Sequence, residues 1–202
     1  MSEPALPLIP LASLEDGQDW PAQGEWTYED YLRLPDDGRR YEVIRGVLYV
    51  SPPPLIIHQT AQSRLFGALY NHVAANHLGI VYAAPVDVLL PERIAEPVEP
   101  DLLFIREENR PQGGDRNFQG VPDLVVEILS PSTRSYDRKT KLAAYRDAGV
   151  PEFWLVDPQT RTVVVYGWKE GQFTELEHGG EGDEVGSTVL PGFRVQVGQL
   201  FR

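Results

Sequence analysis

The chain has 202 residues, 42% hydrophobic and 24% charged, as expected for one globular domain, and its lack of cysteine excludes disulfides, zinc–thiolate sites and thiol nucleophiles. It shows neither a secretory signal nor an apolar stretch of the roughly 20 residues that span a membrane, so we expect a cytoplasmic protein. The net charge of −12 argues against a protein that coats nucleic acid nonspecifically, because affinity for phosphate depends on clustered Lys and Arg.

The first fifty residues are predicted to hold an extension, a short helix and a hairpin. Residues 1–25 are rich in proline and small residues without clear periodicity, which indicates a tail or a loosely packed extension, and residues 26–202 are expected to form a single domain. Thr27, with Asp30 three residues later, resembles a capping box that begins a helix. The strand-like segment 41–50 has a central Arg-Gly pair and predicts a hairpin.

The middle of the chain is predicted to pass from helix to strands. Apolar residues at helical spacing predict one long helix over residues 58–78. Residues 80–90 and 101–106 have the composition of strands, joined by a loop that contains proline and glutamate. Residues 107–120 are polar and glycine-rich, which favours a mobile surface loop.

The second half alternates strands with one helix. We expect a strand over residues 123–129, a helix over 137–148 and two strands, 153–156 and 162–166, that form a hairpin. The Gly- and Glu-rich remainder is expected to add one or two edge strands, ending with residues 189–201. This order of elements predicts a mixed α/β or α+β domain in which helices cover a sheet.

The most informative residue is a carboxylate inside an apolar strand. Glu127 lies within Leu124–Leu129, where an unpaired carboxylate would cost several kcal/mol, so it must be neutralised, paired or bound to a metal. Side chains alternate along a strand, so Asp123 and Glu127 share one face, and Asp101 from a neighbouring strand would complete an oxygen-rich cation site. Glu42 in the first hairpin could supply a further oxygen. A buried ion pair is the structural alternative for Glu127.

Two lysines follow the strand, Lys139 and Lys141. They lie about 200° apart around a helix, so only one can face the site, and Lys141 is closer to the apolar stripe. A lysine there would stabilise negative charge and help an attacking water in metal-assisted hydrolysis of a phosphodiester. The alternative is a helical ion pair between Lys141 and Asp137. Three histidines lack metal-ligand spacing and are interpreted as structural or surface residues: His58, His72 and His77.

Several sequence segments, in this order, resemble the Uma-two family (domain of unknown function 820) of the PD-(D/E)XK restriction-endonuclease-like superfamily. They are residues 41–46, 122–133, 137–145, 149–158 and 190–193. The resemblance extends from about residue 26 to the C-terminus and implies a restriction-endonuclease-like core, with a central mixed β-sheet flanked by helices.

The resemblance also implies a function, Mg²⁺-dependent (or Mn²⁺-dependent) hydrolysis of DNA phosphodiester bonds by an endonuclease. Asp101 and Glu127 would hold the metal, Glu42 would add a metal or water contact, and the backbone carbonyl of Ile128 could also reach the ion. The superfamily lysine normally stands two residues after the strand acid, where this chain has a leucine. The family resemblance places it instead on the following helix, at Lys141, where it would assist the water and the charged transition state.

Two alternatives to a DNA endonuclease stay open. One is a noncatalytic, nuclease-derived domain that binds a protein or nucleic acid and regulates it, which the acidic net charge and the displaced lysine favour. The other is a metal-dependent hydrolase of smaller phosphate esters. Asp123 is a weaker site candidate than the other acids, and Lys139 is the second candidate for the lysine. A homodimer is a further expectation, because nucleases that cut both strands often work in pairs.

Overall fold

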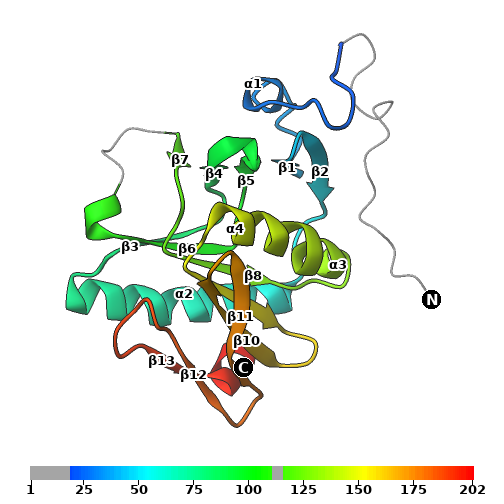
Figure 1. The fold of residues 1–202 in the computed structure, drawn as a ribbon. Helices are drawn as coiled ribbons and strands as arrows, with labels where there is room; N and C mark the ends of the chain where they lie inside the picture. The colour runs from blue at the N-terminus through cyan, green and yellow to red at the C-terminus, as the bar shows by residue number, and fades with distance from the viewer. Residues whose placement is uncertain (1–18, 111–115) are drawn as a thin grey trace.

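In the computed structural model, which describes residues 19–110 and 116–202, a six-stranded sheet forms the centre of the molecule (Figure 1). Its strands β8 and β9 are parallel, and its other neighbouring strands are antiparallel, so the sheet is mixed. In spatial order the strands are β11 (Gln172–Gly179), β10 (Thr162–Lys169), β9 (Glu152–Asp157), β8 (Leu124–Ile128), β6 (Leu102–Arg106) and β3 (Gly79–Ala83).

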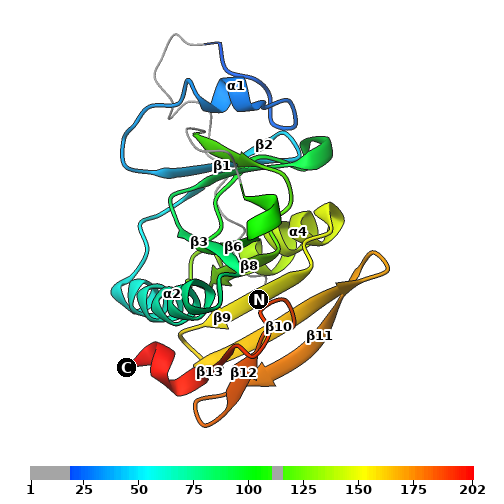
Figure 2. The ribbon, with the colours of Figure 1, turned by 90° about the vertical axis from the view of Figure 1, so that its left-hand side faces the viewer.

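Helices cover the two faces of this sheet, as Figure 2 shows. Helix α2 (Ile56–Asn76) packs Leu65 and Leu69 into one hydrophobic cluster with Trp154 of β9. A second helical segment covers the other face and consists of α3 (Arg134–Tyr136), a π-helical turn (Asp137–Lys141) and α4 (Leu142–Ala148). This arrangement gives the central sheet two buried faces, which explains the continuous apolar run of β8.

A second sheet of five strands lies beside the first, near α1 (Tyr28–Tyr31). Its strands β4 and β7 are parallel, and its other neighbours are antiparallel. In spatial order they are β2 (Val47–Ser51), β1 (Arg40–Ile44), β5 (Ala95–Val98), β4 (Asp87–Leu90) and β7 (Asn117–Gln119). The C-terminal part adds a two-stranded sheet, β12 (Glu184–Gly186) with β13 (Arg194–Gln196), and a final 3₁₀ turn, Val197–Phe201.

The main predicted elements are present. Thr27 and Asp30 form a capping box at the start of α1, since each side chain bonds the backbone N–H of the other. The predicted hairpin is β1–β2, and the predicted long helix is α2, which begins two residues earlier. The strand that carries Glu127 is β8, and Gly149, in the left-handed conformation, ends the helical segment that follows.

Two predicted loops contain strands, and the C-terminal region contains more strands than expected. The predicted loop between the strands of residues 80–90 and 101–106 holds β5, and the predicted loop over residues 107–120 holds β7. Both strands are short and pair with β4, and β5 also pairs with β1, a long-range contact that a local sequence pattern does not reveal. The C-terminal region forms β11, β12 and β13, where one or two strands were expected. Residues 111–115 of the predicted loop lie outside the described residues.

The N-terminal extension is described only in part, because residues 1–18 lie outside the described residues. Its last residues contact the domain: Trp20 stacks on Trp26 at 5.4 Å between ring centroids, and the N–H of Gly24 bonds the carbonyl of Gly46. Within residues 19–110 and 116–202, none of the helices is long and apolar enough to cross a membrane.

Candidate active site

Two of the predicted metal-binding acids lie next to each other at one end of the six-stranded sheet. β6 and β8 are antiparallel with Leu102 opposite Val126, so extending this register by one residue places Asp101 opposite Glu127. Cross-strand neighbours point to the same face of a sheet. The Oδ2 atom of Asp101 accepts a hydrogen bond from the backbone N–H of Ile128 at 2.7 Å, which fixes the position of this carboxylate beside Glu127.

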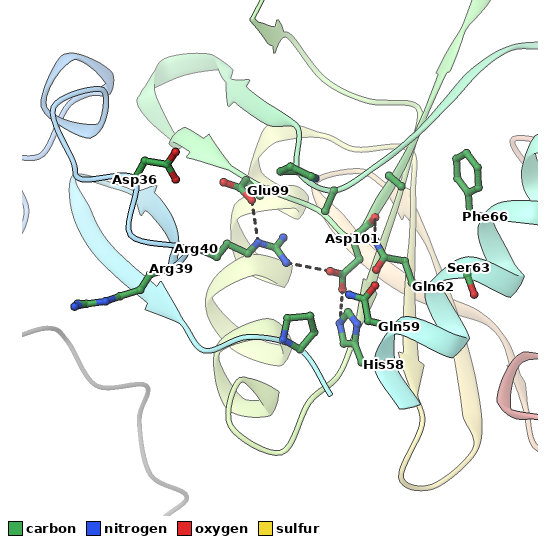
Figure 3. Close-up of a pocket in the computed structure, with 15 residues that line it drawn as sticks. Asp36, Arg39, Arg40, His58, Gln59, Gln62, Ser63, Phe66, Glu99 and Asp101 are labelled. Atoms are coloured by element: carbon green, nitrogen blue, oxygen red, sulfur yellow. Dashed lines mark hydrogen bonds and ion pairs between the residues drawn. The ribbon is translucent and has the colours of Figure 1, made fainter. Parts of the chain in front are cut away.

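Asp101 is also held by Arg40 and His58, which the sequence did not assign to the site (Figure 3). Arg40 Nη1 lies 3.1 Å from Asp101 Oδ1, and His58 Nε2 lies 3.2 Å from Oδ2. Burial opposes ionisation of Asp101, but the hydrogen bond to His58 and the charge of Arg40 hold the pKa of its carboxyl well below its usual range. Asp101 is therefore a charged carboxylate at neutral pH.

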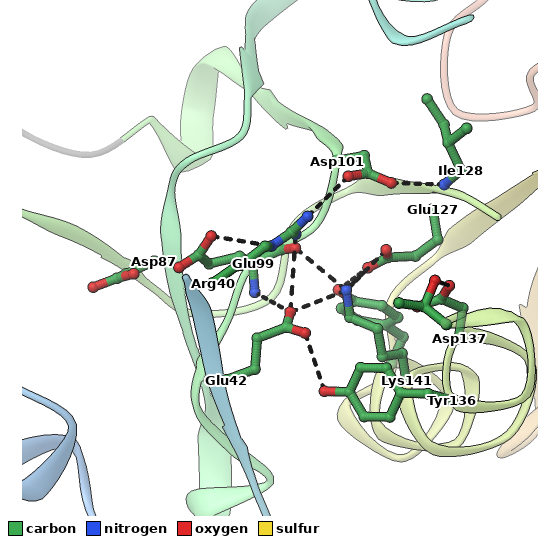
Figure 4. A network of polar contacts seen from close by, with 12 residues as sticks. Arg40, Glu42, Asp87, Glu99, Asp101, Glu127, Ile128, Tyr136, Asp137 and Lys141 are labelled. Atoms are coloured by element: carbon green, nitrogen blue, oxygen red, sulfur yellow. Dashed lines mark hydrogen bonds and ion pairs between the residues drawn. The ribbon is translucent and has the colours of Figure 1, made fainter. Parts of the chain in front are cut away.

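Glu127 is 1% exposed and shares its carboxylate between a lysine and a tyrosine (Figure 4). Lys141 Nζ lies 2.7 Å from Oε1 and 2.8 Å from Oε2, and the Tyr145 hydroxyl donates to Oε1 at 2.7 Å. Burial raises the pKa of Glu127 to about 8, although the charge of Lys141 acts in the opposite direction. Lys141 thus forms a buried ion pair with the strand acid, which both the active-site hypothesis and the structural alternative for Glu127 predict, and its ion pairs are with Glu127 and Glu42 rather than with Asp137.

Glu42 joins the second sheet to this pair. Its Oε1 atom lies 3.0 Å from Lys141 Nζ and accepts the backbone N–H of Glu99 at 2.8 Å, while Oε2 accepts the Tyr136 hydroxyl at 3.1 Å. Burial opposes ionisation of Glu42, but Lys141 and Arg40 lower its pKa below the ordinary value. One carboxylate of β1 therefore contacts both the helical segment and the residue before Pro100.

The buried acids outnumber the bases around them. Five buried carboxylic acids share an arginine, a lysine and a histidine: Glu42, Glu99, Asp101, Glu127 and Asp137 with Arg40, Lys141 and His58. Burial raises the pKa of Glu99 to about 7 and that of Asp137 to about 6, although Arg40 and Lys141 respectively act in the opposite direction. The cluster therefore either binds protons or favours an additional cation.

A cavity of about 140 Å³ opens onto these acids. Asp101, Glu127, Ile128 and Lys141 line it, whereas Glu42 does not. The other side of the cavity carries hydroxyl groups: Ser130 Oγ lies 2.8 Å from Thr133 Oγ1, and Thr133 donates to Asp137 Oδ2 at 2.6 Å. Polar and charged side chains, among them the predicted metal ligands Asp101 and Glu127, thus line the cavity together with Pro52, Pro53 and Pro54.

Two weaker candidates lie outside the cluster. Asp123 shares the face of Glu127 but stands four residues away, about 13 Å along a strand. It pairs with Arg106 Nε at 3.2 Å and accepts the Asn109 side-chain amide at 3.3 Å, so it fixes the turn after β6. Lys139 is exposed, on the opposite side of the helical segment from the buried Lys141.

Two of the carboxylates that line the cavity are suitable ligands for a hard divalent cation. Among residues 19–110 and 116–202, no three His, Asp or Glu side chains stand close enough together to hold a metal ion. Mg²⁺, however, commonly binds proteins through one or two carboxylates and completes its shell with water and substrate phosphate. Asp101 and Glu127 supply two carboxylates on one cavity, and the excess of acids favours a cation there.

The fold belongs to a nuclease-like α+β class. It is similar to the crystal structure of a "putative nuclease belonging to DUF820" from Anabaena variabilis, with a TM-score of 0.73 and 20% sequence identity over 87% of this chain and 97% of that one. The chain belongs to the Uma2 family, described as "Putative restriction endonuclease", which it matches over residues 28–198. None of the curated proteins compared with the chain matches it. The family resemblance and the expected fold are therefore confirmed.

Proposed function

We propose that this protein is a Mg²⁺-dependent endonuclease that hydrolyses DNA phosphodiester bonds at the cavity between Asp101 and Lys141. The observation that carries the proposal is the convergence of Asp101, Glu127 and Lys141 on one polar cavity, in a chain of a restriction-endonuclease family. An acid, a second acid and a buried lysine are the groups that metal-assisted hydrolysis of a phosphodiester needs.

Asp101 and Glu127 would hold the ion, and Mn²⁺ would replace Mg²⁺ at the same ligands. When bound, the cation would supply positive charge beside the phosphate and make water a better nucleophile. The expected contribution of the Ile128 carbonyl stays part of this proposal, because Ile128 lines the cavity. Glu42 acts in this proposal through Lys141, since it contacts this lysine but does not line the cavity.

Lys141 would stabilise charge rather than accept a proton. Burial opposes its charge, but Glu127 and Glu42 raise its pKa above the ordinary value, so the ammonium stays protonated at neutral pH. A permanent cation next to the reacting phosphate lowers the energy of the more negative transition state. Tyr145 and Tyr136 hold the two carboxylates that position this ammonium, through hydrogen bonds of 2.7 Å and 3.1 Å.

The direct test is nicking of supercoiled plasmid DNA by the purified full chain with and without Mg²⁺. Glu127→Ala should abolish Mg²⁺-dependent nicking, and Asp101→Asn should abolish binding of Mn²⁺ measured by calorimetry. Asp123→Asn is the matched control, because this acid lies on the same face outside the cluster and should leave both measurements unchanged.

Nicking that survives Glu127→Ala would overturn the proposal. A wild-type protein that binds DNA without cutting it would instead support the noncatalytic, regulatory alternative. The expected homodimer remains a prediction, which light scattering of the same preparations checks.

A further inference from the structure

A larger groove adjoins the cavity and differs from it in chemistry (Figure 3). It has a volume of about 670 Å³ and shares Arg40, His58 and Asp101 with the cavity as lining residues. This volume is within the range of roughly 300–1,000 Å³ that accommodates small organic ligands. The cavity and the groove therefore adjoin each other at these three residues.

One wall of the groove consists of neutral polar and aromatic side chains from α2. Gln59 and Ser63 are exposed, and Phe66 of the same helix follows them along the wall. The turn between β3 and β4 adds small apolar residues, Ala84 and Pro85. Phe66 packs against the core and stacks on Tyr70 at 5.8 Å between ring centroids, and its ring remains partly exposed in the groove. The wall therefore offers an aromatic ring for stacking and amide groups for hydrogen bonding, which are the two features that bind nucleobases.

The charged side chains of the groove are not arranged to bind a row of backbone phosphates. Its two arginines already pair with acids, Arg39 with Asp37 at 3.0 Å and Arg40 with Glu99 and Asp101 at 3.1 Å each. Among the described residues, the other ionisable groups that line it are acids and one histidine. Duplex binding depends on phosphate contacts from unpaired Lys and Arg, so the groove favours a neutral part of the substrate.

We propose that the groove binds an unpaired base of a DNA strand, next to the phosphate held at the cavity, and that the protein therefore prefers single-stranded or locally unpaired DNA. The phosphate lies at the cationic end, near Lys141 and the proposed metal, and the base stacks against the wall that contains Phe66. This inference rests on the proposed function, because it takes DNA as the substrate.

Binding of fluorescein-labelled oligonucleotides to the full chain, followed by anisotropy, tests the proposal. The probes are a single strand of about 12 nucleotides, within the usual site sizes of single-strand binders, and its blunt duplex. Both are measured in Ca²⁺, which takes the same oxygen ligands as Mg²⁺. We expect the single strand to bind at least about tenfold more tightly than the duplex.

Phe66→Ala should weaken binding of the single strand by about five- to tenfold, because loss of one base–aromatic stack has an effect of this order. Phe66→Trp should retain binding, whereas Phe66→Leu, which keeps an apolar side chain for packing but has no ring to stack, should weaken it as Phe66→Ala does. Trp168→Ala is the control, because it removes a partly exposed aromatic ring that does not line the groove. Circular dichroism of each variant verifies that it is folded.

Equal or tighter binding of the duplex would overturn the inference, and so would a folded Phe66→Ala variant with unchanged affinity. These outcomes are distinct from failure of the proposed function. A protein that binds single strands through Phe66 but shows no Mg²⁺-dependent cleavage would retain the base-binding groove and lose the nuclease. Cleavage that requires Glu127 but is unchanged in Phe66→Ala would support the nuclease and exclude the base-binding groove.

Discussion

Two glutamates on neighbouring parallel strands, Glu127 of β8 and Glu152 of β9, are both almost completely buried, yet their surroundings differ. Glu152 accepts hydrogen bonds from neutral donors: the Trp154 indole at 2.8 Å and the backbone N–H and hydroxyl of Thr188 at 2.7 Å and 2.6 Å. Glu127 shares the charge of Lys141 with another acid and lines a cavity.

The difference separates a structural carboxylate from a candidate catalytic one. Neutral donors that satisfy both oxygens of Glu152 fasten the segment around Thr188 to the sheet and leave no group for a ligand. Around Glu127, acids exceed bases and a polar space remains open, so a cation or a substrate can still improve the local electrostatics. Burial of a carboxylate alone does not indicate function.

Removal of the structural carboxylate, Glu152, should destabilise the fold more than any of the changes that follow. Glu152→Ala leaves three protein donors without an acceptor, the Trp154 indole and the backbone N–H and hydroxyl of Thr188, and should lower the free energy of unfolding by about 3 kcal/mol, measured by urea denaturation. Glu152→Gln keeps the size and one acceptor oxygen and should lose less. If Glu152→Ala were as stable as the wild type, the comparison of the two glutamates would fail.

The second prediction concerns the lysine partner of Glu127. Lys141→Met should reduce Mg²⁺-dependent nicking by about 100-fold, because it removes the buried charge beside the reacting phosphate. Lys139→Met removes an exposed lysine of the same helical segment and should change the rate less than about twofold. Equal losses in the two variants would show that general positive charge, and not the position of Lys141, supports cleavage.

The third prediction is a pH dependence of stability. The folded pKa values of Glu99, Glu127 and Asp137 are raised to about 7, 8 and 6, so the folded state binds more protons than the unfolded state above pH 4.5. The free energy of unfolding should therefore fall as the pH rises from 4.5 to about 8 in the absence of metal. Asp101 and Glu42 have lowered pKa values, and their contributions change only below that window.

Glu127→Gln sharpens this test because the amide cannot ionise. Its free energy of unfolding should fall less between pH 5 and 8 than that of the wild type, by on the order of 2 kcal/mol, measured by denaturation at a series of pH values. Glu152→Gln provides the comparison. A wild-type protein that becomes more stable over this range would contradict the raised pKa values.

The smallest expected effect is stabilisation by metal. Mg²⁺ at about ten times its dissociation constant should raise the free energy of unfolding of the wild type by about 1 kcal/mol. At a fixed Mg²⁺ concentration, the increase should be larger at pH 8 than at pH 6, because the ion displaces protons from the cluster. Asp101→Asn should remove the increase, whereas an unchanged increase in this variant would place the ion elsewhere.

Much of the fold was predictable because its signals are local. The capping box at Thr27, the hairpin of β1 and β2, and the stripe of α2 depend on residues close in sequence. The short strands β5 and β7 were missed because they are held by pairing with β4 and, for β5, also with β1, and no local pattern indicates that pairing.

The candidate site was predictable where a charged residue stands out among apolar neighbours in the sequence. Glu127 is a single acid among aliphatic residues, and helical geometry distinguished Lys141 from Lys139. Arg40 was missed because it follows polar and turn-forming residues that suggest a surface position, and His58 was missed because the histidines of the chain lack metal-ligand spacing. One signal was available: Arg40 and Glu42 are two residues apart on a strand, so they share the face that carries the site.

The π-helical turn has a consequence for how the site is spaced along the chain. Tyr136 and Tyr145 are nine residues apart, which an unbroken α-helix would turn through about 900°, leaving the two rings on opposite sides. Both hydroxyls nevertheless donate into one cluster, to Glu42 and Glu127. Without one residue of the turn, such as Lys139, the residues Tyr136, Lys141 and Tyr145 would stand at i, i+4 and i+8. The three side chains thus share one face of the helical segment because the π-helical turn accommodates a single additional residue between the first and the second of them.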